Sequence, residues 1–130
     1  MRILLADEQT RVRLALQILL SQEPGVTVVG EAAEATDLLA QIRATRPDLV
    51  LLDWGLPELV SIGSLSALHT ACPNLSVIVL SGRPEARPMA LAAGADEFIS
   101  KIDSPEKLLA AIRTMNAKNS GVDLLSAQSV

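Results

Sequence analysis

Three carboxylates stand directly after short apolar runs of the chain. Asp7 and Glu8 follow the run at residues 3–6, and Asp53 follows the run at 49–52. If these runs are parallel strands of one sheet, the three side chains meet at one edge, because ligand sites in such sheets lie beyond the carboxyl ends of the strands. Carboxylates that close repel one another unless a cation or a proton relieves them. Mg²⁺ is suited to this role, since it prefers oxygen ligands and commonly uses one or two carboxylates with phosphate oxygens.

Two further polar groups stand at the ends of later apolar runs. Ser81 follows the run at 76–80, and Lys101 follows the run at 97–100. A carboxylate can attack a phosphoryl group to form an aspartyl phosphate when metal and cationic groups offset charge on the transferring oxygens. Lys101 supplies an ammonium and Ser81 a hydroxyl for that chemistry. We assign no role to Glu31, which ends the remaining run.

The rest of the sequence predicts the elements that would position these residues. Short runs rich in β-branched residues and leucine predict five buried strands, at residues 2–6, 26–29, 49–52, 76–80 and 97–100. Apolar residues at helical spacing, prolines in first turns and Ser104 as an N-cap predict five helices, at about 12–19, 35–42, 64–71, 88–94 and 105–117.

Strands that alternate with helices imply right-handed βαβ units, and hence a parallel sheet covered on both faces. We therefore predict a single α/β domain with a doubly wound (βα)₅ fold and a five-stranded parallel sheet in the flavodoxin-like order 2-1-3-4-5. The domain is expected to cover residues 1–117. Residues 118–130 are expected to be a C-terminal tail or the start of a linker.

The composition narrows the classes of function. Of the 130 residues 49% are apolar, and the formal net charge is −4, so no basic face for direct nucleic-acid binding is expected. No apolar run approaches the roughly 20 residues of a membrane helix. The lone Cys72 and the lack of a leader before the first strand predict a cytoplasmic protein. The arginines are scattered among acids and are expected to be solvated: Arg11, Arg13, Arg43, Arg46, Arg83, Arg87 and Arg113.

Taken in order along the chain, these motifs resemble the receiver domain of bacterial two-component response regulators. The matching stretches are ILLADE at 3–8, LVLLDWGLP at 49–57, VIVLSG at 77–82 and AAGADEFISK at 92–101. The resemblance covers residues 1–117. The segment from Lys101 through the last helix is similar to receivers that are joined to helix-turn-helix DNA-binding domains.

The resemblance implies a role for each site residue. Asp53 would be the phosphoacceptor, and Lys101 would pair with the phosphate. Asp7 and Glu8 would hold Mg²⁺ together with Asp53 and the backbone carbonyl of Gly55.

Ser81 and Phe98 would form a switch pair. Ser81 would move to the new phosphoryl group and Phe98 would turn into the vacated space, which changes the surface formed by the fourth helix, the fifth strand and the fifth helix. The implied function is a phosphorylation-dependent signalling switch, regulatory rather than enzymatic, which assists its own phosphorylation and dephosphorylation. The implied partners are a sensor histidine kinase, a downstream effector or a DNA-binding domain absent from this chain, and a second copy in a homodimer.

The sequence departs from the family pattern at two places, and the second of them, the loop at 58–64, leaves an alternative open. Ile102 stands where many receivers have proline, and the loop at 58–64 lacks the commonest glycine-containing pattern. The alternative is a pseudo-receiver, a protein-binding module that acts without phosphorylation, and Mg²⁺ binding together with reaction with a small phosphodonor separates the two.

Two enzyme classes fit the sequence poorly. A nucleotide- or flavin-binding enzyme would need a glycine- or hydroxyl-rich phosphate loop where residues 7–9 are acidic or amide. An aspartyl phosphatase typically has a second carboxylate two residues after the nucleophile, where this chain has Gly55.

Overall fold

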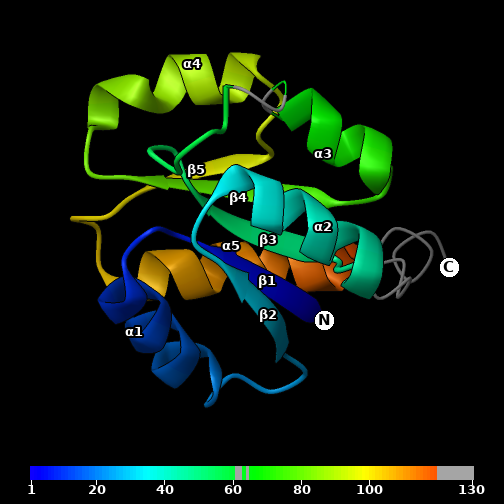
Figure 1. Cartoon of the computed structure of the whole chain (residues 1–130). Coiled ribbons are helices and arrows are strands. Elements are labelled where there is room, and N and C mark those ends of the chain that lie inside the picture. Colours follow the sequence, from blue (N-terminus) through cyan, green and yellow to red (C-terminus); the bar gives the residue numbers. More distant parts are fainter. Residues whose placement is uncertain (61–62, 64, 120–130) are drawn as a thin grey trace, which may run out of the picture.

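The computed structural model describes residues 1–60, 63 and 65–119 of the chain (Figure 1). Its strands form one parallel sheet in the order β2-β1-β3-β4-β5, which confirms the predicted topology. The strand bounds are β1 Arg2–Ala6, β2 Thr27–Ala32, β3 Leu49–Asp53, β4 Ser76–Ser81 and β5 Glu97–Ser100.

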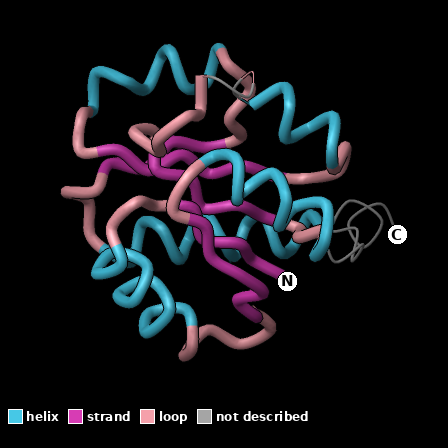
Figure 2. The backbone as a smooth tube through the Cα atoms, in the orientation of Figure 1, coloured by secondary structure: helices cyan, strands magenta, loops and turns pink. Residues whose placement is uncertain are grey.

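The helices cover both faces of the sheet, with α1 and α5 on one face and α2, α3 and α4 on the other (Figure 1). Their bounds are α1 Thr10–Leu20, α2 Ala35–Thr45, α3 Leu65–Ala71, α4 Arg87–Ala92 and α5 Pro105–Asn119, with a 3-10 turn at Pro84–Ala86 before α4. None of the helices in these described ranges is long and apolar enough to cross a membrane. The loops that leave the carboxyl ends of the strands gather at one edge, on the left of Figure 2.

The central strands β1, β3 and β4 are almost continuously apolar because both faces of the sheet are buried there. Along β1, Leu4 and Ala6 belong to the core under α2, α3 and α4, whereas Ile3 and Leu5 belong to the core under α1 and α5. Successive side chains of a strand point to opposite faces, so one short run supplies both cores. The sheet is thereby fixed from both sides, and its carboxyl edge is a rigid platform for the side chains that follow each strand.

Strand β2 differs most from its prediction, which placed it at residues 26–29. The strand continues through Gly30 and Glu31, and the register of β1 against β2 shifts so that Leu4 pairs with Gly30. A Cβ atom at Gly30 would meet the side chain of Gln41 on α2 and would lie 2.8 Å from Cδ1 of Leu4, so glycine leaves room for these two side chains. The strand was underestimated because a glycine and a glutamate interrupt its apolar pattern.

The carboxyl-terminal boundary also differs slightly. Helix α5 begins at Pro105, as predicted, but continues to Asn119, two residues beyond the predicted end at 117. The remainder of the predicted tail, residues 120–130, lies outside the described residues, as do 61, 62 and 64 of the unusual loop at 58–64.

Candidate functional site

Two carboxylates from different strands converge on one lysine at the carboxyl edge of the sheet. Asp7 follows β1, Asp53 ends β3 and Lys101 follows β5. The Lys101 Nζ atom lies 3.0 Å from Oδ2 of Asp7 and 3.2 Å from Oδ1 of Asp53. The lysine side chain is long enough to reach over β4 to the two acidic positions, so the structure brings together three of the residues singled out by sequence.

The charges of this group are partly withdrawn from solvent. The side chain of Asp7 is 2% exposed, that of Asp53 17% and that of Lys101 29%. Burial by itself lowers the pKa of Lys101, but the hydrogen bond with Asp7 and the negative charges of Asp53 and Asp7 outweigh it, and the pKa lies above its ordinary value. Lys101 is therefore an ammonium at neutral pH.

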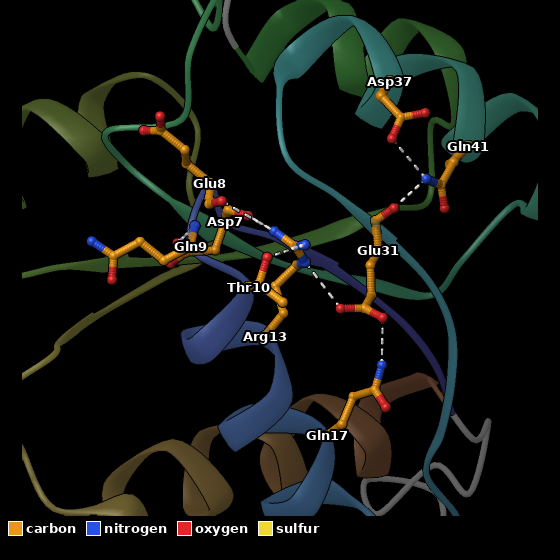
Figure 3. Close-up of polar contacts among 9 residues, drawn as sticks. All are labelled: Asp7, Glu8, Gln9, Thr10, Arg13, Gln17, Glu31, Asp37 and Gln41. Carbon is orange, nitrogen blue, oxygen red and sulfur yellow. Dashed lines mark hydrogen bonds and ion pairs between the residues drawn. The ribbon is translucent and has the colours of Figure 1, made fainter.

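The side chains of the adjacent carboxylates Asp7 and Glu8 are placed differently. One oxygen of Asp7 contacts Lys101, and its other oxygen, Oδ1, accepts a hydrogen bond of 2.8 Å from the backbone N–H of Gln9. Glu8 is exposed, and its side chain extends away from the hydrogen-bonded network (Figure 3). Across the described ranges, no three His, Cys, Asp or Glu side chains converge as a group that could hold a metal ion.

The residues that do converge are nevertheless suited to Mg²⁺. Asp7 and Asp53 offer hard carboxylate oxygens that share one cation, and Mg²⁺ is commonly held by one or two carboxylates with several retained waters. The backbone N–H of Leu56 donates to the carbonyl of Asp53 at 3.0 Å, which turns the chain tightly after β3. A Cβ atom at Gly55 would lie 3.7 Å from Oδ2 of Asp53, so the Gly55 backbone lies beside that carboxylate.

Ser81 and Phe98 are both buried, on the neighbouring strands β4 and β5. Ser81 is 6% exposed, its hydroxyl accepts a 3.1 Å hydrogen bond from the backbone N–H of Arg83, and its carbonyl accepts a 2.8 Å hydrogen bond from the backbone N–H of Lys101. Phe98 is 4% exposed and packs in the core under α2, α3 and α4. The Arg87 guanidinium donates to the carbonyl of Phe98 at 3.3 Å. Helix α4 is thus tied to β5 at the predicted switch residue.

One contact of the acidic turn was missed by sequence reasoning, and the expectation that Arg13 is solvated is wrong. Its side chain is only 14% exposed, and it donates to the backbone carbonyl of Asp7 and to the carboxylate of Glu31 (Figure 3). A signal was present: Arg13 and Gln17 are four residues apart on one helix, and Glu31 is a carboxylate within an otherwise apolar strand.

The family follows from comparison with known proteins. The family model for the response regulator receiver domain matches residues 3–113. The chain belongs to this family. It is therefore a receiver domain of two-component signalling, and it has the family's fold and strand order.

Relatives and solved structures agree with this assignment. The receiver is 34% identical over 111 residues to the uncharacterized transcriptional regulatory protein YhcZ of Bacillus subtilis, covering 84% of this chain and 52% of that protein. It is 27% identical to the response regulator protein VraR of Staphylococcus aureus, covering 86% of this chain and 54% of that protein. The chain spans about half the length of these curated relatives.

Among solved structures, a CheY-like receiver domain protein from Methanospirillum hungatei is 30% identical with a TM-score of 0.77, covering 92% of this chain and 96% of that chain. A LuxR-family two-component response regulator from Aurantimonas is 28% identical with a TM-score of 0.78, covering 90% of this chain and 85% of that chain.

Proposed function

We propose that this receiver accepts a phosphoryl group on Asp53 from a sensor histidine kinase, in a reaction that depends on Mg²⁺. The observation that supports it is the convergence of Asp7 and Asp53 on the ammonium of Lys101 at the carboxyl edge of the sheet. Asp53 keeps 17% of its side chain exposed, so a phosphodonor can reach it, whereas Asp7 at 2% is shielded.

The chain's own residues divide the work of phosphoryl transfer. A carboxylate oxygen of Asp53 forms the new bond to phosphorus while the bond from phosphorus to the donor's nitrogen breaks, and the leaving nitrogen keeps that electron pair. Lys101 is charged and contacts Asp53 at 3.2 Å, so its ammonium can stabilise the negative charge on the phosphoryl oxygens as they are transferred. Asp7 and Asp53, with Glu8 and the Gly55 carbonyl, would hold Mg²⁺, which offsets the remaining charge when bound.

Ser81 and Phe98 would convert the modification into a change of surface. The Ser81 hydroxyl can exchange its contact with the Arg83 amide for a hydrogen bond to a phosphoryl oxygen. Movement of Ser81 would change the packing around Phe98 on the adjacent strand and, through the hydrogen bond of Arg87 to Phe98, the position of α4. The face of α4, β5 and α5 is therefore the proposed output surface, and a phosphorylation-dependent change there is the signal.

The kinase would dock beside the site, in a groove of about 660 Å³ between α1 and the start of α5. Its lining is mostly apolar and includes Ile18 of α1, which is 59% exposed, and Leu108 of α5. Lys101 lines the same groove, so a partner bound there lies next to the phosphorylation site. This continuity favours the kinase as the occupant.

The wider setting is also a proposal. The curated relatives are about twice as long, and three of them are named as transcriptional regulatory proteins or regulators. We therefore infer a cytoplasmic regulator whose output is a DNA-binding domain in a longer chain or a separate effector, with homodimerisation as one means of coupling. The acidic net charge of −4 argues against DNA binding by the receiver itself.

Intact-protein mass spectrometry after incubation with acetyl phosphate tests the function. We expect one phosphoryl adduct on the wild type with Mg²⁺, and none when EDTA replaces the metal or when Asp53→Asn is used. A folded wild type that gains no adduct from either acetyl phosphate or a cognate kinase would favour the phosphorylation-independent binding module.

A further inference from the structure

An arginine on α1 holds the backbone of the turn that carries Asp7 and Glu8. Nη1 of Arg13 donates to the carbonyl oxygen of Asp7 at 2.5 Å and to that of Glu8 at 3.3 Å (Figure 3). Its Nη2 donates to Oγ1 of Thr10 at 3.2 Å. The guanidinium therefore spans the turn between β1 and α1, the segment that carries both carboxylates.

The other end of the guanidinium is anchored by β2. Nε of Arg13 lies 3.0 Å from Oε1 of Glu31, and Oε2 of Glu31 accepts a 2.6 Å hydrogen bond from Nε2 of Gln17 (Figure 3). Gln41 of α2 donates to the carbonyl of Glu31 and is itself hydrogen bonded to Asp37 at 3.1 Å. Gln17 of α1 thus fixes the Glu31 carboxylate that orients Arg13, and Gln41 of α2 fixes the backbone of Glu31.

This network is built into the protein rather than lying on its surface. The Arg13 side chain is 14% exposed, whereas Arg113, which makes a comparable two-bond contact with Glu23 elsewhere, is 56% exposed. Two of the acceptors of Arg13 are neutral carbonyl oxygens, so these contacts fix the position of the backbone instead of cancelling a charge. A planar guanidinium with five N–H donors can make such contacts simultaneously, which a single ammonium cannot.

We propose that Arg13 is a positioning residue of the site and that Glu31 aims its guanidinium at the Asp7–Glu8 turn. The inference rests on the proposed function, because its readout is the binding of Mg²⁺ by the acidic residues. Replacing a group that orients metal ligands typically weakens metal binding by about 10- to 100-fold. With the turn released, Asp7 and Glu8 would spend less time where both can serve one cation.

The positioning role of Arg13 is tested by the dissociation constant of Mg²⁺, measured by calorimetry on the full chain. Whether the constant rises or falls in an Arg13 variant decides between the two explanations below. Arg13→Gln removes a positive charge near a cation site, so electrostatics alone predicts tighter binding. Loss of positioning predicts weaker binding, and we expect the dissociation constant to rise about tenfold or more. Arg113→Gln removes the same charge from the exposed Glu23 pair and should leave the constant within about twofold of wild type.

Arg13→Lys is the second variant, for use if Arg13→Gln does not fold. It keeps the charge, so electrostatics predicts no change, whereas loss of the planar contacts predicts weaker binding. Thermal unfolding of each variant ensures that the titrations are made on folded protein. If Arg13 only stabilised the fold, the dissociation constant of Mg²⁺ in such folded variants would be unchanged.

The outcomes separate this inference from the proposed function. Weaker binding in the Arg13 variants with unchanged binding in Arg113→Gln supports it. A wild type that binds Mg²⁺ together with an Arg13→Gln or Arg13→Lys variant of equal or tighter affinity overturns the positioning role alone. A folded wild type that binds no Mg²⁺ overturns both.

Discussion

The carboxylates of Asp7 and Asp53 share one ammonium, so replacing Lys101 with methionine leaves two negative charges facing each other without compensation. Removing one partner of a fully buried ion pair costs about 3–5 kcal/mol. Because Lys101 keeps 29% exposure and Asp53 17%, solvent screens part of this cost, and we expect Lys101→Met to lower the free energy of unfolding by about 2–3 kcal/mol without metal.

Mg²⁺ should reverse most of that loss, since a cation bound by the same carboxylates replaces the missing charge. Stabilisation by a bound ligand grows with its affinity for the folded state, and a site without the competing ammonium binds the cation more tightly. In saturating Mg²⁺ the difference between Lys101→Met and the wild type should fall below about 1 kcal/mol. Urea denaturation at neutral pH, in EDTA and in Mg²⁺, measures both quantities.

Lys107 provides the matched control. Its side chain is 64% exposed and pairs at 3.6 Å with Asp103, which lies four residues earlier, just before α5. Lys107→Met should change the free energy of unfolding by less than about 0.5 kcal/mol with or without metal. An equal loss for Lys101→Met in EDTA and in Mg²⁺ would show that the lysine stabilises the fold by packing, and no loss in EDTA would refute the reasoning from shared charge.

Three further predictions concern the pKa of Lys101, the packing around Gly30 and the groove beside α1. Burial lowers the pKa of Lys101, but Asp7 and Asp53 raise it overall. The stability that the charged lysine contributes is therefore present below the unfolded pKa of about 10.4 and is lost as pH rises through the folded pKa. In EDTA the difference in stability between wild type and Lys101→Met should shrink above about pH 10.4, and a constant difference would contradict this. Gly30→Ala places a Cβ against the side chain of Gln41 and 2.8 Å from the fully buried Leu4, and should cost about 1–3 kcal/mol in urea denaturation. Gly82→Ala, with nothing within 4 Å, should cost far less, and equal costs would argue against close packing around Gly30. Ile18→Glu should slow phosphotransfer from the kinase while leaving the reaction with acetyl phosphate unchanged, and equal effects on both donors would argue against docking in the groove beside α1.

The sheet was predictable because its strands are buried on both faces. The predicted runs at 2–6 and 97–100 coincide with β1 and β5. Polar residues stand only at the ends of these two runs, so they mark the ends of the strands. Edge strand β2 was less predictable, because Gly30 and Glu31 interrupt its pattern for reasons that depend on Leu4 and Arg13, far from it in sequence.

The candidate site was predictable in part. The rule that ligands bind beyond the carboxyl ends of parallel strands correctly brought together Asp7, Asp53 and Lys101. That rule does not say which of two adjacent carboxylates points inward, and here Asp7 is buried while Glu8 is exposed. The contact of Arg13 with Glu31 depends on how β2 lies beside β1, which the spacing of Arg13 and Gln17 on one helix does not fix by itself.

The central claim is that Asp53, and neither of the other carboxylates at the edge, carries the phosphoryl group. Borohydride reduces an acyl phosphate to the alcohol, so treatment of the phosphorylated protein should convert the modified aspartate to homoserine, and peptide mass spectrometry then locates it. We predict homoserine at position 53 alone, only after incubation with phosphodonor and Mg²⁺. Reduction at Asp7 or Glu8 instead, or an adduct that borohydride leaves intact, would contradict the account.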